Sequence, residues 1–234
     1  MSIELKNLCF NKIKEDAGNI CLNGSDSYIY TYPEFLKYFE KITKINRHSL
    51  VIASHFMYGW MPRMIKLNLN EEDRVLQILN NVRCGKILEE DEIKTLKSCI
   101  NNSMVGLSKL LHFINPEEYA IWDSNVFTYL TESTGDYYHV NKIELYLEYL
   151  KGIKEIAEED KNDEVVKSIL ERFNKVCPGL YLSLSPLRAI EVVMFETGRK
   201  LKGNVKKYIP LINYFPINPI TRNYFLSASV GFGT

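Results

Sequence analysis

The stretch of residues 103–130, SMVGLSKLLHFINPEEYAIWDSNVFTYL, constrains the fold of this chain more than any other. Its apolar residues recur at helical spacing, and Asn115 and Asp123 each stand where a helix start needs a capping side chain. Gly106 precedes the first apolar run and predicts a short turn before a helix over 107–114. The stretch therefore predicts helices packed on helices.

The rest of the chain carries the same helical pattern. Thr31 and Glu34 form a T-x-x-E capping box, which predicts a helix start at Thr31. Residues 49–62 are apolar almost all round, as expected of a helix that is buried on most sides. Caps and periodicity predict further helices over 71–84, 89–100, 124–130, 142–159, 165–176, and from 186 to 198 or 203. We expect a mainly α-helical protein.

The domain organisation follows from the lack of any internal repeat or low-complexity linker, which predicts one domain over residues 1–234. Glycine, asparagine and serine punctuate residues 1–30 and predict an irregular, loop-rich entry or a small hairpin. Residues 31–209 form the predicted helical body. Residues 210–234 contain three prolines and predict an irregular aromatic tail.

The charge balance limits the partners. Lys and Arg number 29 and so do Asp and Glu, so no global field attracts nucleic acid or an anionic membrane. A nucleic-acid partner therefore needs a local basic face. The best candidate is the cluster around Gly203 that includes Lys202, Lys206 and Lys207, although a solvated loop would have the same composition.

The cysteines and the apolar runs indicate the compartment. Five cysteines, odd in number and without a CxxC pair, argue against a disulfide framework and against a zinc site. No apolar run approaches the ~20 residues that a membrane-spanning helix needs. We expect a cytoplasmic protein with no metal and no membrane partner.

Asp123 is the candidate carboxylate. An Asp at a helix start is most often an N-cap, whose amide hydrogen bonds keep it ionised. Beside Trp122, the same carboxylate would also suit stabilising a sugar cation or orienting a water in N-glycosidic cleavage. Tyr58 and Trp60 could stack an extruded base, or pack in the core. A lone histidine on an apolar helix face, such as His112, is predicted to be a hydrogen-bonded core residue.

The order of glycine turn, helix with Lys109, short connection and Ala120-Ile121-Trp122-Asp123 resembles the helix-hairpin-helix DNA glycosylase superfamily, which includes endonuclease III and the 8-oxoguanine and 3-methyladenine glycosylases. The resemblance covers residues 93–130. It implies a two-lobed all-α fold and DNA-backbone contacts by Gly106, Ser108 and Lys109. It also implies that Asp123 promotes loss of a flipped base. We expect Tyr58, Trp60 and Trp122 to line the base pocket.

Two departures from that family pattern narrow the expected activity. Met104 stands where the first hairpin glycine belongs, and Ser108 occupies the place of the lyase lysine. The resemblance therefore implies a monofunctional N-glycosylase acting on DNA more than on RNA. No four-cysteine iron–sulfur pattern follows, so no cofactor is expected. The alternative is a non-catalytic helical domain that binds nucleic acid or another protein.

Overall fold

The computed structural model describes residues 3–61, 64–134, 136–160, 163–177 and 184–208, with side chains to residue 203. Within these ranges the secondary structure is helical, apart from one isolated antiparallel bridge between Leu67 and Ile100. The prediction of a mainly α-helical protein is confirmed. The predicted tail over 210–234 lies outside the described residues.

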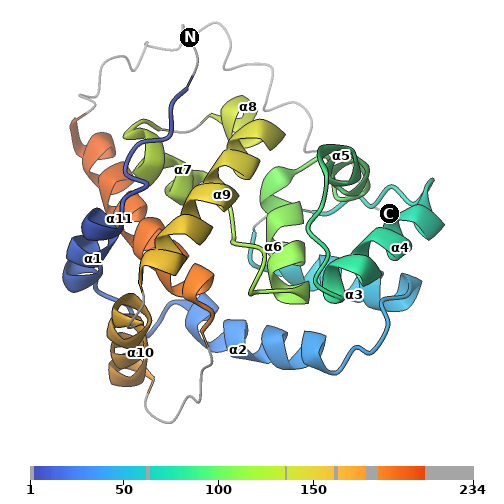
Figure 1. The fold of residues 1–234 in the computed structure, drawn as a ribbon, viewed down its shortest axis with the longest axis horizontal. Coiled ribbons are helices and arrows are strands. Elements are labelled where there is room, and N and C mark those ends of the chain that lie inside the picture. Colours follow the sequence, from blue (N-terminus) through green and yellow to red (C-terminus); the bar gives the residue numbers. More distant parts are fainter. Residues whose placement is uncertain (1–2, 62–63, 135, 161–162, 178–183, 209–234) are drawn as a thin grey trace, which may run out of the picture. The chain divides into compact units, whose positions relative to one another are not determined.

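Eleven helices lie in the described part of the chain (Figure 1). They are α1 (Phe10–Asn19), α2 (Ser27–Glu40), α3 (Arg47–Gly59), α4 (Glu72–Arg83), α5 (Glu90–Cys99), α6 (Met104–Ile114), α7 (Ser124–Thr131), α8 (Tyr137–Val140), α9 (Ile143–Glu159), α10 (Glu164–Val176) and α11 (Pro186–Tyr208). The chain divides into two compact units, Met1–Lys202 and Gly203–Thr234, and the site described below lies within the first. No described helix is long and apolar enough to cross a membrane.

Helix α6 is the centre of the first unit. It packs against α2, α3, α4 and α5, and every residue from Gly106 to Ile114 is buried. The predicted glycine turn before this helix is wrong, because α6 already begins at Met104. Its start is fixed by the Ser103 side chain, which accepts a hydrogen bond from the Gly106 amide at 3.1 Å.

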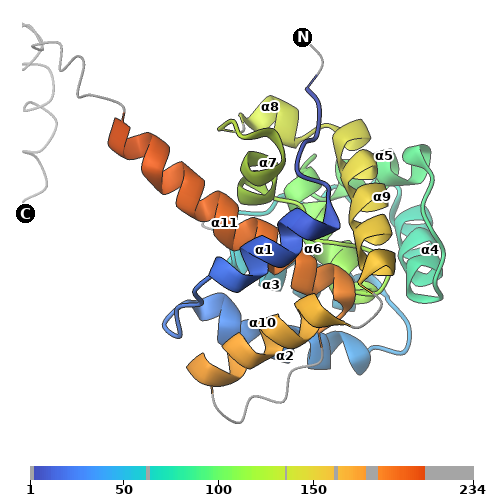
Figure 2. The ribbon, with the colours of Figure 1, turned by 60° about the vertical axis from the view of Figure 1, so that its left-hand side comes forward.

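The entry to the chain is more regular than predicted. Helix α1 occupies residues that were expected to be loop, because Ile13, Asp16 and Ala17 form a buried stripe at helical spacing. Helix α1 contacts α10 and α9, and Figure 2 shows it beside α10. Helix α2 begins at Ser27, so the predicted capping box at Thr31 does not form. Thr31 lies inside the helix and donates its hydroxyl to the Ser27 carbonyl at 2.9 Å.

Helix α3 confirms the helix predicted over 49–62, with a shifted start. Asn46 and Ser49 form a reciprocal capping box, which places the first helical residue at Arg47. The predicted burial on most sides is only partly correct. Leu50, Ala53 and Met57 are buried, whereas His55 is exposed and Phe56 is 41% exposed.

Helix α11 is longer than predicted, and the reason lies at Gly198. The sequence predicts that this helix ends at Gly198 or Gly203, whereas it continues to Tyr208. A Cβ atom built on Gly198 would lie 2.0 Å from the carbonyl oxygen of Asn125. Gly198 therefore does not end the helix but allows α11 to approach the backbone of α7.

Candidate functional site

The chain segment that leads into Asp123 is held by buried hydrogen bonds. The Ser108 hydroxyl accepts from the Trp122 amide at 3.0 Å and donates to the Trp122 carbonyl at 3.1 Å. The Trp122 indole donates to the Val140 carbonyl at 2.7 Å. These bonds join the segment to α6 and α8, and they fix the backbone from which Asp123 projects.

Asp123 caps α7 with one of its two carboxylate oxygens. Oδ1 accepts hydrogen bonds from the amides of Asn125 at 2.7 Å and Val126 at 3.0 Å, which favour the ionised form. Oδ2 accepts no hydrogen bond from the residues that the structure describes. The side chain is half-buried. The capping role predicted for Asp123 is confirmed, and it leaves one carboxylate oxygen for other contacts.

Two cavities meet at Asp123. One, here called the α8 cavity, has a volume of about 470 Å³ and includes Tyr58, Asn101, Ser103, Tyr137 and Asn141 in its walls. The other, the α11 cavity, has a volume of about 250 Å³ and includes Tyr28, Arg188, Glu191 and Phe195. Trp60, Lys109 and Asp123 line both cavities.

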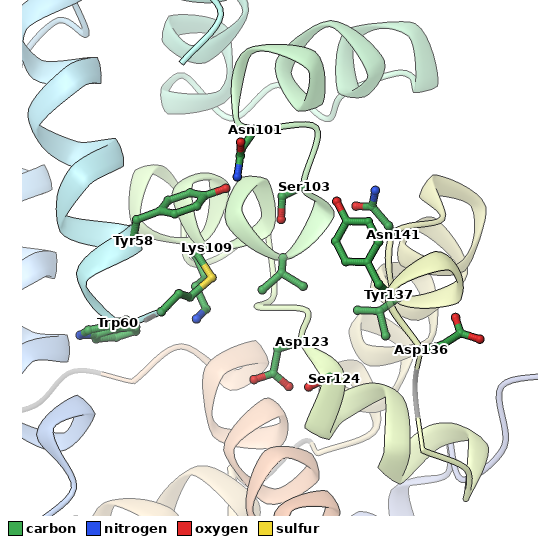
Figure 3. Close-up of a pocket in the computed structure, with 13 residues that line it drawn as sticks. Tyr58, Trp60, Asn101, Ser103, Lys109, Asp123, Ser124, Asp136, Tyr137 and Asn141 are labelled. Carbon is green, nitrogen blue, oxygen red and sulfur yellow. The ribbon is translucent and has the colours of Figure 1, made fainter. Parts of the chain in front are cut away.

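Lys109 supplies the cationic group of this shared wall. Figure 3 shows its amine and the Asp123 carboxylate pointing toward the same space, with Trp60 on one side and Tyr137 on the other. The Lys109 side chain is only 8% exposed, and its Nζ lies 5.8 Å from the centroid of the Trp60 ring. Burial lowers the pKa of Lys109, against the opposing charges of Asp123 and Glu191.

A buried ion pair forms part of the α11 cavity. Arg188 and Glu191, one turn apart on α11, are joined by a short hydrogen bond, and the Arg188 guanidinium lies 4.6 Å from the centroid of the Tyr32 ring. Burial raises the pKa of Glu191 to about 7, although Arg188 opposes the shift. The spacing of these two residues in the sequence is typical of an ordinary intrahelical pair. The signal that it is buried is its place in the apolar run PLRAIEVVMF.

The predicted base-pocket residues separate into two groups. Tyr58 and Trp60 line the α8 cavity, and the Trp60 indole is oriented by a 2.6 Å hydrogen bond to the Thr31 hydroxyl. Trp122 is fully buried and lines neither cavity. The placement of Trp122 in a base pocket is therefore wrong, because its ring is packed among core side chains such as Phe127 and Tyr149.

Three of the predicted phosphate-binding residues, Gly106, Ser108 and Lys109, lie on α6. The Gly106 amide is used by the Ser103 cap, and a Cβ on Gly106 would lie 2.7 Å from the Tyr58 hydroxyl. Ser108 is fully buried. Neither group is open to a phosphate, so these two assignments are wrong. Lys109 lies in the cavity wall instead of on the outer surface.

The basic cluster around Gly203 is described only in part. Lys202 donates a hydrogen bond to the Ser124 hydroxyl at 2.7 Å, next to Asp123. The side chains of Lys206 and Lys207 lie outside the described residues. The phosphate-binding role of this cluster stays a prediction.

His112 is the buried core residue that the sequence predicts. One ring nitrogen, Nε2, lies 3.0 Å from the Tyr32 hydroxyl, and Nδ1 lies 2.7 Å from the Tyr119 carbonyl oxygen. Burial lowers the pKa of His112 to about 3, so the ring is neutral and its Nδ1 donates to the carbonyl.

Several cavity residues have no counterpart in the sequence prediction. Asn101, Ser103, Tyr137 and Asn141 come from the segments before α6 and after α7, and only the fold brings them together. Their one local signal in the sequence is the pair of adjacent tyrosines, Tyr137 and Tyr138. In the described part of the chain, no group of three His, Cys, Asp or Glu side chains is placed to hold a metal ion.

Comparisons with protein-family models, with curated proteins and with solved structures find no match to this chain. The chemistry of the site is therefore inferred from its own residues.

Proposed function

We propose that this protein is a helix-hairpin-helix DNA-glycosylase-like hydrolase, with the two-lobed fold of that superfamily, that cleaves the N-glycosidic bond of an extruded base in nucleic acid. The observation that carries the proposal is the unused oxygen of Asp123, on a wall shared by two cavities. If its own helix had satisfied both oxygens, Asp123 would be a cap and nothing more.

The two cavities can be assigned to different parts of such a substrate. A planar base fits the α11 cavity, whose walls include the rings of Tyr28, Trp60 and Phe195. The sugar then lies at Asp123, and the rest of the strand occupies the more polar α8 cavity. The bond between the sugar and the base then lies where the two cavities meet, next to Asp123. This is the bond that is cleaved.

The main requirement of this reaction is a negative charge near the sugar. As the bond from C1′ to the base nitrogen breaks, its electron pair leaves with the base and positive charge develops on the sugar. The Asp123 carboxylate stabilises that charge, and water adds at C1′. The proton released by the water is taken up by the departing base, so that atoms and charge balance.

Lys109 gives the site a second reactive group. Its amine faces the same space as Asp123, and burial lowers its pKa, which increases the neutral fraction. When this amine attacks C1′ in place of water, the base leaves with the electron pair of the C1′–N bond and takes one amine proton. The C1′–O4′ bond then opens, O4′ takes the second amine proton, and a C1′=N Schiff base forms. Borohydride reduction would trap the resulting Schiff base on Lys109, whereas attack by water alone leaves nothing to trap.

The proposal is tested with single-stranded and duplex oligonucleotides that carry uracil, hypoxanthine, 8-oxoguanine or 3-methyladenine. Base release is detected as an abasic site that alkali cleaves. We expect the wild-type protein to release at least one of these bases, and Asp123→Asn to release none at a comparable rate. Equal release by both proteins would contradict the role of Asp123.

A non-catalytic helical domain is the second candidate, and one observation favours it. Gly106 and Ser108 are enclosed in α6, so the predicted backbone-binding hairpin is missing. If the domain binds nucleic acid without turnover, the wild-type protein and the Asp123→Asn variant should bind it with equal affinity. Its affinity would fall steeply with salt, because Lys and Arg contacts to phosphate release counterions. A protein-interaction domain would bind no nucleic acid even at low salt.

A further inference from the structure

Two adjacent tyrosines on α8 have no part in the chemistry described above. Tyr137 and Tyr138 are 61% and 69% exposed. Tyr137 also lines the α8 cavity, and Figure 3 shows its ring beside Asn141, on the opposite side of the cavity from Trp60. Tyr137 is therefore continuous with the space in front of Asp123, and Tyr138 is the next residue along the exposed helix.

The helix that carries these tyrosines is capped at its start, and its end is hydrogen-bonded to the segment before α6. Asp136 caps α8 by accepting a hydrogen bond from the His139 amide at 2.8 Å. At the other end, the Asn141 amide group donates to the Asn102 carbonyl at 2.9 Å and accepts from the Met104 amide at 2.8 Å. Exposed rings on a rigid support lose little conformational entropy when a ligand stacks on them.

The charges around the pair suit an anionic strand. Lys142 Nζ lies 4.9 Å from the centroid of the Tyr138 ring, and Lys97 donates to the Asn141 carbonyl at 2.7 Å. Asp136 is the one acid within residues 136–142; it lines the α8 cavity, and its carboxylate lies 2.8 Å from Nδ1 of His139. Aromatic rings beside cations form the usual surface for unpaired bases and their phosphates.

We infer that Tyr137 and Tyr138 form a stacking platform for the unpaired bases next to the base held at Asp123, so that the substrate is a single-stranded segment of nucleic acid. The inference rests on the proposed function. A free nucleoside fills only the α11 cavity and the space at Asp123, whereas a strand continues across the α8 cavity to the tyrosines.

Fluorescence anisotropy with a short labelled oligothymidine tests the platform. We expect Tyr137→Ala and Tyr138→Ala each to weaken binding roughly tenfold or more, since stacking on an aromatic ring contributes this much per base. Tyr137→Phe and Tyr138→Phe keep the ring and should bind as wild type. The dependence of affinity on salt should not change, because no phosphate contact is removed.

Tyr30→Ala is the matched control, because Tyr30 is 49% exposed and lines neither cavity. It should bind the strand as wild type. The inference is overturned if the Tyr137 and Tyr138 alanine variants also bind as wild type, if the phenylalanine variants bind as weakly as the alanine ones, or if the wild-type protein binds no single strand. Circular dichroism melting verifies that each variant is folded.

Base release, measured on the same variants, separates this inference from the proposed function. Tyrosine-dependent strand binding without any base release would keep the platform and reject the hydrolase. Base release that is equal in the wild type and in both alanine variants would keep the hydrolase and reject the platform.

Discussion

Helices α6 and α7 begin in the same way, yet only one of these starts offers a reactive group. Ser103 and Asp123 each accept amide hydrogen bonds from the first turn of the helix that follows. The single oxygen of Ser103 is used by this bond. Asp123 has a second oxygen, and it lies where two cavities meet. Capping alone does not define a site, but a cap with an unused charged oxygen beside a cavity can.

The largest expected effect comes from Asp123→Asn, which preserves the cap and removes the charge. Asparagine is as good an N-cap as aspartate, so the free energy of unfolding should change by no more than about 1 kcal/mol. Base release should fall by about 100-fold or more, because the stabilising charge is lost. Single-turnover rates and thermal melting measure the two effects. A large loss of stability would mean that Asp123 is mainly structural.

Gly198→Ala should have the next largest effect, because it disturbs the support of α7. The new Cβ would lie 2.0 Å from the Asn125 carbonyl oxygen, which is backbone and cannot rotate away. We expect a loss of about 1–3 kcal/mol in unfolding free energy. Base release should fall as well, since Asp123 precedes this turn.

Gly106→Ala is the substitution in α6 that corresponds to Gly198→Ala in α11. There the nearest atom to the new Cβ is the Tyr58 hydroxyl at 2.7 Å, the far end of a side chain that can shift. The loss of stability measured by urea denaturation should therefore be smaller than for Gly198→Ala. The reverse order would show that α6, rather than α7, is the sensitive helix start.

Ser103→Ala removes the other cap and nothing else of importance. Loss of a serine N-cap costs about 1 kcal/mol, so the melting temperature should fall by a few degrees. The rate of base release at a temperature where the variant is folded should equal that of the wild type. Ser103→Asn should restore the lost stability, and a rate loss in Ser103→Ala would instead place Ser103 in the chemistry.

Lys109→Met should have the smallest effect on stability, and the size of this effect depends on pH. Because burial lowers the pKa of Lys109, the folded protein binds this proton less tightly than the unfolded chain. At neutral pH the protonated lysine therefore destabilises the fold, and methionine should be equal or slightly more stable. As pH rises between the lowered pKa and the ordinary value of 10.5, the wild type gains stability and the advantage of methionine shrinks. An advantage that grows with pH would contradict this assignment.

The sequence predicts most helices because periodicity and caps are local properties. Asp123 and the helix after it are predicted correctly for this reason, since the capping residue is adjacent to the amides that it binds. Helix α1 is not predicted because its buried stripe includes Asp16, which pairs with Lys12 one turn away. The other oxygen of Asp16 accepts a 2.8 Å hydrogen bond from the hydroxyl of Tyr129, in a distant part of the chain. Such a partner leaves no local pattern.

The two informative glycines show a different limit. The sequence predicts a turn at Gly106 and a helix end at Gly198, which are the commonest uses of glycine. Both lie inside helices, where the missing side chain makes room for Tyr58 and for the backbone of Asn125. Whether a glycine ends a helix or admits a neighbour depends on what packs against it, which the sequence does not contain.

The fixed position of Trp60 has a practical consequence. Its indole is tied to Thr31, and its ring lines both cavities, whereas Trp122, the second of the two tryptophans in the chain, is fully buried. Intrinsic fluorescence excited at the tryptophan band therefore contains one component that senses the cavities and one that does not. A ligand entering either cavity would change the emission of Trp60 alone. The protein thus carries its own optical probe, and unlabelled compounds can be screened against the site directly.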